Sequence, residues 1–216
     1  MSRRGMMTAS GVPKPPMLTD RILLIDAPLE TNVNDISGNG NHLTKGTGGA
    51  FVTIAGEQCL SAITANGGAY STFPINDVIN SCEIHLDFNL NSYGTNTTYH
   101  NIIDSSRSGG NTGIFTQIEK GVWRIGFGGN ASWYYIIPLT QTPINTWIRL
   151  VFSVKKQKLV VKIINLATGT EYVYDSIINL PVNIIGLSTD LVLGGNMYYS
   201  RYLNGYIKNF KLYTFI

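Results

Sequence analysis

The sequence predicts an all-β fold, an antiparallel β-sandwich of jelly-roll type, preceded by a flexible N-terminal arm. From residue 21 onward, apolar and polar residues alternate with the period of two that is typical of strands. Turn signals rich in Gly and Asn recur about every ten residues. No window of about eleven residues combines a helical period with a capping residue. These three observations together indicate strands and turns in place of helices.

The candidate strands are short and spread evenly along the chain. They cover residues 21–26, 51–54, 59–63, 83–90, 99–104, 113–118, 122–127, 133–138, 146–154, 159–164, 171–177, 191–193 and 206–215. About a dozen short strands joined by such turns are typical of an antiparallel sandwich. Gly and Asn at residues 128–130 should turn one of these strands back on the next, because both residue types accept a positive φ at little cost.

Two segments predict which residues form the core. In EIHLDFNL the apolar row consists of Ile84, Leu86, Phe88 and Leu90. Alternation sends the remaining residues to the opposite face, which we expect to be solvated: Glu83, His85, Asp87 and Asn89. In WIRLVFSV and the segment after it, the apolar row consists of Ile148, Leu150, Phe152, Val154, Leu159, Val161 and Ile163. The turn between these two segments predicts a hairpin.

Length and composition exclude several classes of protein. A chain of 216 residues with 44% hydrophobic residues fits a single sandwich domain. The net charge of +3 is too small to indicate a nucleic-acid partner. No apolar run approaches the ~20 residues of a membrane span. Cys59 and Cys82 are too few for a zinc site or a disulfide framework, so we expect reduced core residues.

The order of several motifs resembles the concanavalin-A-like, laminin-G-like jelly-roll superfamily. The motifs are LLIDAPLE followed by DISGNGNHLT, then CEIHLDFNL, a Trp-led strand in NTWIRLVFSV, and a final strand that begins Gly205-Tyr206-Ile207. The resemblance covers nearly all of residues 21–216. It implies a laminin-G-like domain over residues 20–216, with residues 1–19 as a separate extended segment.

Residues 1–19 carry no helical or strand period and are predicted to be an anchoring arm. Arg3 and Arg4 would bind acidic groups, while Met6 and Met7 would fill an apolar groove on a larger particle. A frayed terminus is the alternative. The SRRGMM start is similar to short Arg- and Met-rich starts on virion-associated proteins of bacteriophages that infect gut bacteria. The segment has no apolar stretch typical of a secretory signal, so we expect assembly in a host cytoplasm and residence in the virion.

The loop NDISGNGNHLTKGTGG, residues 34–49, suggests a phosphate cradle, a metal loop or a set of tight turns. It lacks the Gly-Lys-Ser/Thr of a phosphate-binding loop, and no helix follows it. Calcium is conceivable, because Asp35, Asn39 and Asn41 offer oxygen ligands, but Asp35 is the loop's only carboxylate. We therefore expect tight turns capped by Asn and Ser, and no cofactor.

The segment EIHLD is the most enzyme-like feature of the chain. Glycosidases with this jelly roll carry two glutamates flanking an Asp on one strand, and the outer carboxylates act as nucleophile and acid/base. Here Glu83 and Asp87 hold the outer positions and His85 the centre. A retaining pair needs its two carboxyl groups about 5 Å apart. The Asp87 side chain is one methylene shorter than that of a Glu, so it reaches less far toward Glu83. Hydrolysis by Glu83 and Asp87 is therefore the lesser alternative, and no nucleophilic triad is evident.

Aromatic residues in or beside loops predict a contact surface. One cluster includes Trp133, after the turn at residues 128–130. The other precedes the final strand and contains Tyr198, Tyr199, Arg201 and Tyr202. Aromatic faces stack on sugar rings, so these residues are candidates for glycan contact. Protein contact within an assembly and plain packing are the alternatives.

The sequence thus predicts a non-catalytic phage virion structural protein, in a head decoration, fibre or tail, with weak glycan adhesion. Its expected partners are other virion proteins, through the arm, and cell-surface or mucosal glycans, with neither nucleic acid nor membrane. A homo-oligomer is left open. A free carbohydrate-binding lectin is the main alternative, ahead of a glycoside hydrolase.

Overall fold

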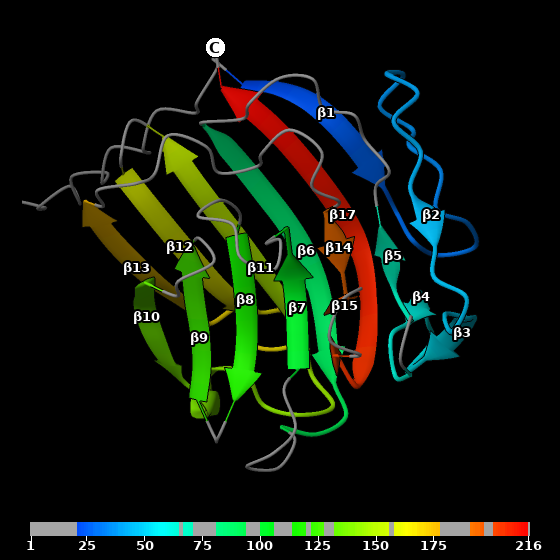
Figure 1. Ribbon diagram of the computed structural model, residues 1–216. Coiled ribbons are helices and arrows are strands. Elements are labelled where there is room, and N and C mark those ends of the chain that lie inside the picture. Colours follow the sequence, from blue (N-terminus) through cyan, green and yellow to red (C-terminus); the bar gives the residue numbers. More distant parts are fainter. Residues whose placement is uncertain are drawn as a thin grey trace, which may run out of the picture.

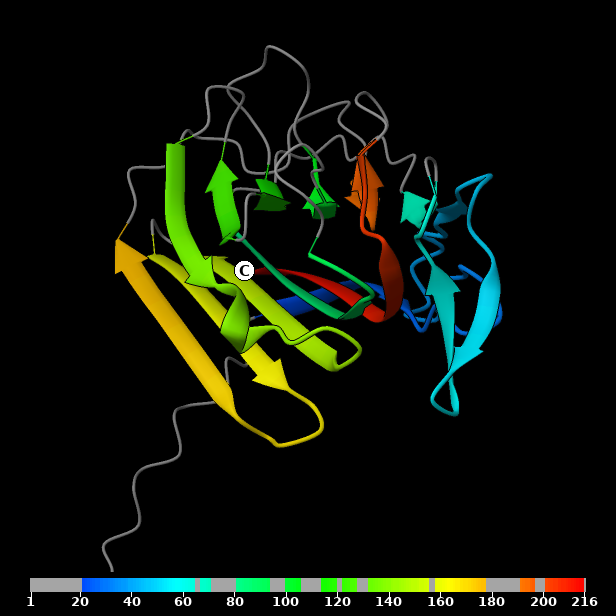
Figure 2. The ribbon, with the colours of Figure 1, turned by 90° about the horizontal axis from the view of Figure 1, so that it is seen from below.

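A computed structural model of the chain describes residues 21–64, 67–70, 81–93, 100–105, 114–119, 122–127, 132–155, 158–177, 191–196 and 201–215. These residues form an all-β sandwich of two antiparallel sheets (Figures 1 and 2). The only helical element among them is a three-residue 3-10 turn, Leu139–Gln141. No helix in this part of the chain is long and apolar enough to cross a membrane. The predicted fold class is confirmed.

The large sheet has eight strands. In spatial order they are β13 (Glu171–Ile177), β12 (Lys158–Asn165), β11 (Trp147–Lys155), β6 (Cys82–Leu90), β17 (Gly205–Phe215), β4 (Glu57–Ser61) and β3 (Phe51–Ile54), with β1 (Arg21–Ala27) pairing β17. The final strand β17 pairs with β6 on one side. Its other side is shared between β4, near its start, and β1, near its end.

The small sheet has seven strands and lies against the large one (Figure 2). In spatial order they are β10 (Ser132–Pro138), β9 (Val122–Phe127), β8 (Ile114–Glu119), β7 (His100–Asp104), β14 (Val192–Leu193), β5 (Ala69–Tyr70) and β2 (Thr44–Lys45). A separate two-stranded ribbon consists of β15 (Gly195–Asn196) and β16 (Arg201–Tyr202).

Each strand predicted from the sequence has a counterpart with ends that agree within two residues. The strands that were missed, β2, β5, β15 and β16, have two residues each. Two residues are too short to show a period, and each of these strands pairs with another two-residue strand, so only the tertiary structure defines them. The predicted arm, residues 1–19, lies outside the described residues.

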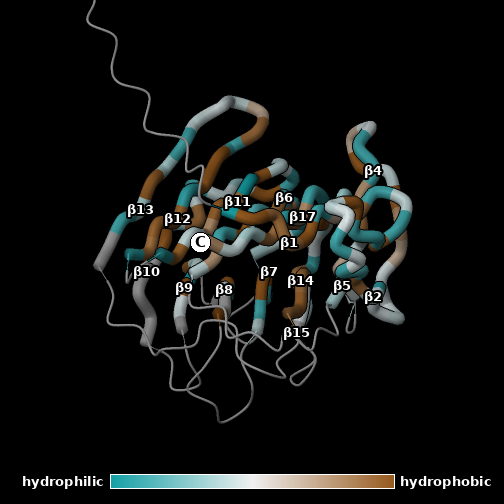
Figure 3. The backbone as a smooth tube through the Cα atoms, turned by 90° about the horizontal axis from the view of Figure 1, so that it is seen from above, coloured by the Kyte–Doolittle hydropathy of each residue, from teal (hydrophilic) through white to brown (hydrophobic). Residues whose placement is uncertain are grey.

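The core fills the space between the sheets, and hydrophobic stretches occur on strands of both layers (Figure 3). The predicted apolar rows of β6, β11 and β12 are all buried. Phe88 of β6 meets Trp123 of β9 edge to face, with ring centroids 5.5 Å apart, which joins the two sheets at their centre. Cys59 and Cys82 are buried and free, as predicted. Burial, together with the nearby charge of Glu83, raises the pKa of Cys82 to about 12.

A glycine opens β17 for a steric reason. Gly205 lies opposite Leu90, and a Cβ atom on Gly205 would collide with the backbone carbonyl of Asn89. The two strands therefore approach more closely than any side chain permits. This contact gives a physical basis for the glycine in the Gly-x-Ile start of the last strand.

We expect Gly205→Ala to lower the free energy of unfolding by about 2 kcal/mol or more, because the colliding atom belongs to a backbone that must shift. Gly169→Ala is the control: Gly169 has a φ of +71° with open space around it, so only dihedral strain of about 1 kcal/mol is expected. Urea unfolding of both variants measures the difference. Equal losses of unfolding free energy in the two variants would show that the backbones of β6 and β17 leave room for a Cβ atom at Gly205.

Candidate functional site

The residues that alternate with the core row of β6 lie on the outer face of the large sheet. The prediction that this face is solvated was wrong. Glu83, Asp87 and Asn89 are only 6%, 1% and 4% exposed, and His85 alone is partly exposed. The reason is tertiary: long side chains from the neighbouring strands lie over this face and pair with its carboxylates.

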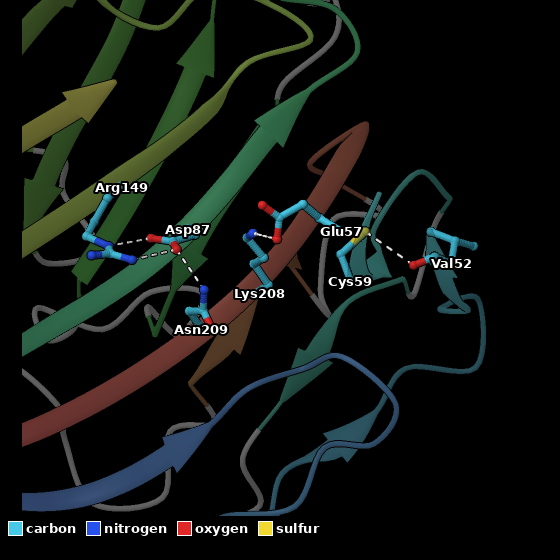
Figure 4. A network of polar contacts seen from close by, with 7 residues as sticks. All are labelled: Val52, Glu57, Cys59, Asp87, Arg149, Lys208 and Asn209. Carbon is cyan, nitrogen blue, oxygen red and sulfur yellow. Dashed lines mark hydrogen bonds and ion pairs between the residues drawn. The ribbon is translucent and has the colours of Figure 1, made fainter. Parts of the chain in front are cut away.

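Asp87 is held by three hydrogen bonds from two strands (Figure 4). Arg149 of β11 donates from Nε and Nη2 at 2.7 and 2.9 Å, a two-pronged contact that fits the planar guanidinium. The hydrogen bond to Asp87 and its charge outweigh burial and raise the pKa of Arg149. Asn209 of β17 donates from Nδ2 at 2.9 Å. It has a φ of 53° and lies where the β6–β17 register shifts, which turns its amide toward Asp87.

Glu83 is paired from the other end of β6. Arg21 of β1 donates to its Oε1, and Nε2 of His85 lies 2.6 Å from the same oxygen. The guanidinium of Arg21 also covers the ring of Tyr213 at 4.2 Å. Burial by itself raises the pKa of Glu83. The hydrogen bond and charge of His85, the charge of Arg21 and a hydrogen bond from Ser153 outweigh it, so the pKa lies below its ordinary value.

This arrangement does not suit glycoside hydrolysis by Glu83 and Asp87. A glycosidase needs one carboxylic acid whose pKa is raised so that it can protonate the leaving group. The pKa of Glu83 is instead lowered, and Asp87 is fully engaged by Arg149 and Asn209. The two residues are also four positions apart on one strand, about 13 Å between Cα atoms. The contacts of both residues therefore stabilise the sheet, and this geometry gives no support to hydrolysis by the pair.

A row of side chains crosses four strands at one end of the same outer face. The register pairs Trp147 of β11 with Asn89 of β6, Asn89 with Tyr206 of β17, and Tyr206 with Ser61 of β4. We call these four residues the aromatic row. Trp147 and Tyr206 are partly exposed, while Asn89 and Ser61 between and beside them are buried. Two strand spacings separate the aromatic residues, about 10 Å.

Lys208 lies beside the aromatic row, opposite Asp87 on the same outer face. Its ammonium lies 4.4 Å from the centre of the Trp147 ring. It also forms an ion pair with Glu57 of β4 (Figure 4). Lys208 is buried, so the pair with Glu57 and the ring face compensate for its lost hydration. The indole Nε1 of Trp147 is buried without a hydrogen-bond partner among the described residues. The ring is thus held in place by contacts on the sheet itself.

Sequence reasoning missed this row. Trp147 was noted only as the first residue of a strand, and Asn89 only as part of a solvated face. The residues that pair with each other in the row are 58 or more positions apart in the chain. Only the pairing of β11, β6, β17 and β4 brings them together. The one available signal was the position of Trp147 and Tyr206, each at or near the start of a long strand.

The loop at residues 34–49 covers the free edge of β1. The register of β1 shifts between Leu23 and Ile25, which leaves the carbonyl of Leu24 outside the ladder. The side-chain amides of Asn39 and Asn41 donate to this carbonyl at 3.2 and 2.9 Å. These hydrogen bonds are consistent with the predicted turns capped by Asn and Ser. They also attach the loop to β1, so that the loop protects this sheet edge.

Asp35 organises this loop. Its Oδ1 accepts from the backbone N–H of Asp26 and of Ser37, each at 2.9 Å. Its Oδ2 accepts from the hydroxyl of Ser37 at 2.8 Å and the N–H of Asn41 at 2.9 Å. Burial alone raises the pKa of Asp35, but these four hydrogen bonds outweigh it and the pKa lies below its ordinary value. Both carboxylate oxygens of Asp35, one of the three residues offered for calcium, accept hydrogen bonds from the loop itself. The described residues contain no group of three His, Cys, Asp or Glu side chains that could hold a metal ion.

We expect Asp35→Asn to destabilise the protein by about 1–3 kcal/mol at pH 7, because an amide cannot accept all four hydrogen bonds. The folded pKa of Asp35 is lowered, so its stabilisation is complete above the unfolded pKa, about 4, and disappears as the pH falls through the folded value. Urea unfolding at pH 7 and near pH 3 should show the variant and the parent converging in acid. Asp175→Asn, at an exposed ion pair, is the control and should change stability little at either pH.

The aromatic residues predicted from the sequence are not all described. Tyr198 and Tyr199 lie outside the described residues, as do Arg3, Arg4, Met6 and Met7. Trp133 and Arg201 are placed on β10 and β16 by their backbones. β10 and β7 are three strand spacings apart, about 14 Å, so Trp133 and the ribbon beside β7 do not form one local cluster.

Tyr202 is fixed against the small sheet. Its carbonyl lies 2.9 Å from Nδ1 of His100 on β7, and the two rings are 6.3 Å apart. Burial lowers the pKa of His100 in spite of this hydrogen bond, so the ring is neutral near pH 7 and donates from Nδ1. Tyr202 remains partly exposed and keeps its place as a predicted contact residue.

No protein-family model matches the chain, and no curated protein matches it. Solved structures do resemble it in fold. The binding domain of botulinum neurotoxin DC in complex with SialylT has 13% identity and a TM-score of 0.64, over 90% of this chain and 48% of that one. The binding domain of Paraclostridial mosquitocidal protein 1 has 17% identity and a TM-score of 0.60, over 89% and 48%. The receptor binding domain of botulinum neurotoxin type G has 14% identity and a TM-score of 0.58, over 88% and 47%.

These likenesses define a class of fold. At such identities they show a shared β-sandwich, and the chain spans about half the length of the solved domains it matches. The named structures are binding domains of toxins. They do not bear on the phage resemblance of the N-terminal segment, which stays a prediction.

Proposed function

We propose that this chain is a non-catalytic carbohydrate-binding module and that the aromatic row is its contact surface. The observation that carries the proposal is the pair of partly exposed rings, Trp147 and Tyr206, on either side of the amide of Asn89. Aromatic faces pack on the C–H surfaces of sugar rings. Asn89 is buried and pairs in register with both aromatic residues, so it sets the spacing between them.

Rigidity supports this role. The aromatic row lies on four paired strands, and Lys208 contacts the Trp147 ring. A preformed surface loses little side-chain entropy on binding, which favours even a small contact. The carboxylates next to the row are all paired with cations, so the surface is suited to binding and not to acid/base chemistry.

The comparisons agree with a binding role. The three solved structures named above are binding domains, and one of them is in complex with SialylT. Since the likeness covers about half of each such domain, the ligand of that complex belongs to that protein. The proposal for this chain therefore depends on its own aromatic row.

We expect Trp147→Ala and Tyr206→Ala each to weaken glycan binding about tenfold or more, the loss typical of a central aromatic contact. A glycan array with the parent protein identifies the ligand, and calorimetry with that glycan measures the variants. Tyr213→Ala is the matched control: another partly exposed tyrosine on the same face of β17, outside the row. It should keep the parent affinity, as should Glu83→Gln.

Two outcomes would contradict this assignment. If Trp147→Ala and Tyr206→Ala bind as well as the parent while Tyr202→Ala loses binding, the contact surface is at the ribbon beside β7. If Glu83→Gln abolishes release of sugar from a polysaccharide that the parent cleaves, the protein is a hydrolase. Thermal unfolding of each variant separates loss of binding from loss of fold.

The finer proposal is that the module is a virion component anchored by residues 1–19. Its support is the sequence resemblance of the SRRGMM start and the separation of this segment from the strand pattern. We expect deletion of residues 1–19 to abolish incorporation into phage particles. Glycan affinity should be unchanged, because the aromatic row lies on strands β4, β6, β11 and β17 of the sandwich. Mass spectrometry of purified particles measures incorporation. Normal incorporation of the deleted protein would remove the anchoring role, and a chain absent from every particle would favour a free lectin.

A further inference from the structure

The edges of the two sheets differ in how they are protected. An unpaired strand edge exposes N–H and C=O groups to another chain, and proteins usually block it with a covering loop, a bulge, a proline or a short strand. The loop at residues 34–41 covers β1. β10 has a register shift between Trp133 and Tyr135 and ends at Pro138. The remaining terminal strands, β3 and β2, have only four and two residues.

β13 has none of these protections among the described residues. It is a seven-residue terminal strand of the large sheet, and its register with β12 runs without a shift. Its sequence, EYVYDSI, contains neither Pro nor Lys. No described backbone group pairs with its free edge. Val173 and Tyr172 are 54% and 36% exposed, so apolar surface accompanies the open edge.

The charges of β13 do not repel a second strand. Glu171 pairs with Lys162 at 2.9 Å and Asp175 pairs with Lys158 at 2.8 Å, so each carboxylate is neutralised by its own neighbouring strand. These pairs are exposed and weak, and they leave the lysines free to share a second carboxylate.

We propose that β13 pairs antiparallel with β13 of a second copy of this chain, about a two-fold axis at Tyr174. This register places Val173 opposite Asp175 of the second copy and Glu171 opposite position 177, so no two carboxylates face each other. Lys162 is the cross-strand neighbour of Val173 and lies in the same row as the second copy's Asp175. The pairing is thus complementary in charge as well as in hydrogen bonding, and it joins two large sheets into one continuous sheet.

Sedimentation of the full-length protein over a concentration series tests the pairing. We expect a monomer–dimer equilibrium for the parent. Val173→Asp places like charges opposite each other twice per interface and should weaken dimerisation about tenfold. Val173→Lys faces Asp175 of the second copy and should leave dimerisation intact or strengthen it. Position 173 is exposed, so neither change opens the core. Val173→Lys faces Lys162 within the same protomer, and thermal unfolding of both variants separates a change in stability from a change in dimerisation.

The double variant Val173→Asp with Asp175→Lys is the decisive control. It keeps the aspartate introduced at position 173, with its low strand propensity, but restores an opposite charge across the axis, so we expect dimerisation to recover. A parent that remains monomeric throughout the series overturns the proposal, even if the edge captures an extended peptide of another protein. A dimer that is unaffected by Val173→Asp, or not rescued by the double variant, also overturns it. None of these outcomes depends on glycan binding.

Discussion

Both faces of the central strand β6 are buried, although only one of them is apolar. The inner row meets the small sheet through Phe88 and Trp123. The outer row carries Glu83 and Asp87, whose charges can be buried only if cations and hydrogen-bond donors come with them. Those donors come from three other strands: Arg149 on β11, Asn209 on β17 and Arg21 on β1. A slip of any of these strands would leave a buried charge without a partner, so the outer row fixes the register of the large sheet.

The same constraint explains why Glu83, although it lies on one strand face with a second carboxylate, has a pKa below its ordinary value. Buried carboxylates on one strand are typical of glycosidases, but catalysis needs an acid with a raised pKa. Here the cations that surround Glu83 and Asp87 are already paired with a carboxylate or packed against a ring. The aromatic row, which we propose as the contact surface, contains the partly exposed Trp147 and Tyr206, and their positions are set by the same paired strands.

The loop at residues 34–41 and the strand β13 show two different treatments of a sheet edge. At β1, the side chains of Asp35, Asn39 and Asn41 form hydrogen bonds with backbone groups of the strand that are not paired with β17. These bonds cover the edge. At β13 the backbone stays open, as far as the described residues reach, beside exposed apolar side chains. Protecting one long edge while leaving another open is what a chain that assembles through a single edge would need.

The sequence by itself determined the strands, the core and the absence of helical periodicity, because these depend on local alternation and on turn residues. It also predicted correctly that Ile84, Leu86 and Phe88 face inward. Strand pairing decided the rest, since it joins segments far apart in the chain. Alternation could assign Glu83 and Asp87 to the second face of β6. It could not show that Arg21, Arg149 and Asn209 would bury them there, nor that Trp147, Asn89 and Tyr206 would form one row, because each contact requires the register of two strands to be known.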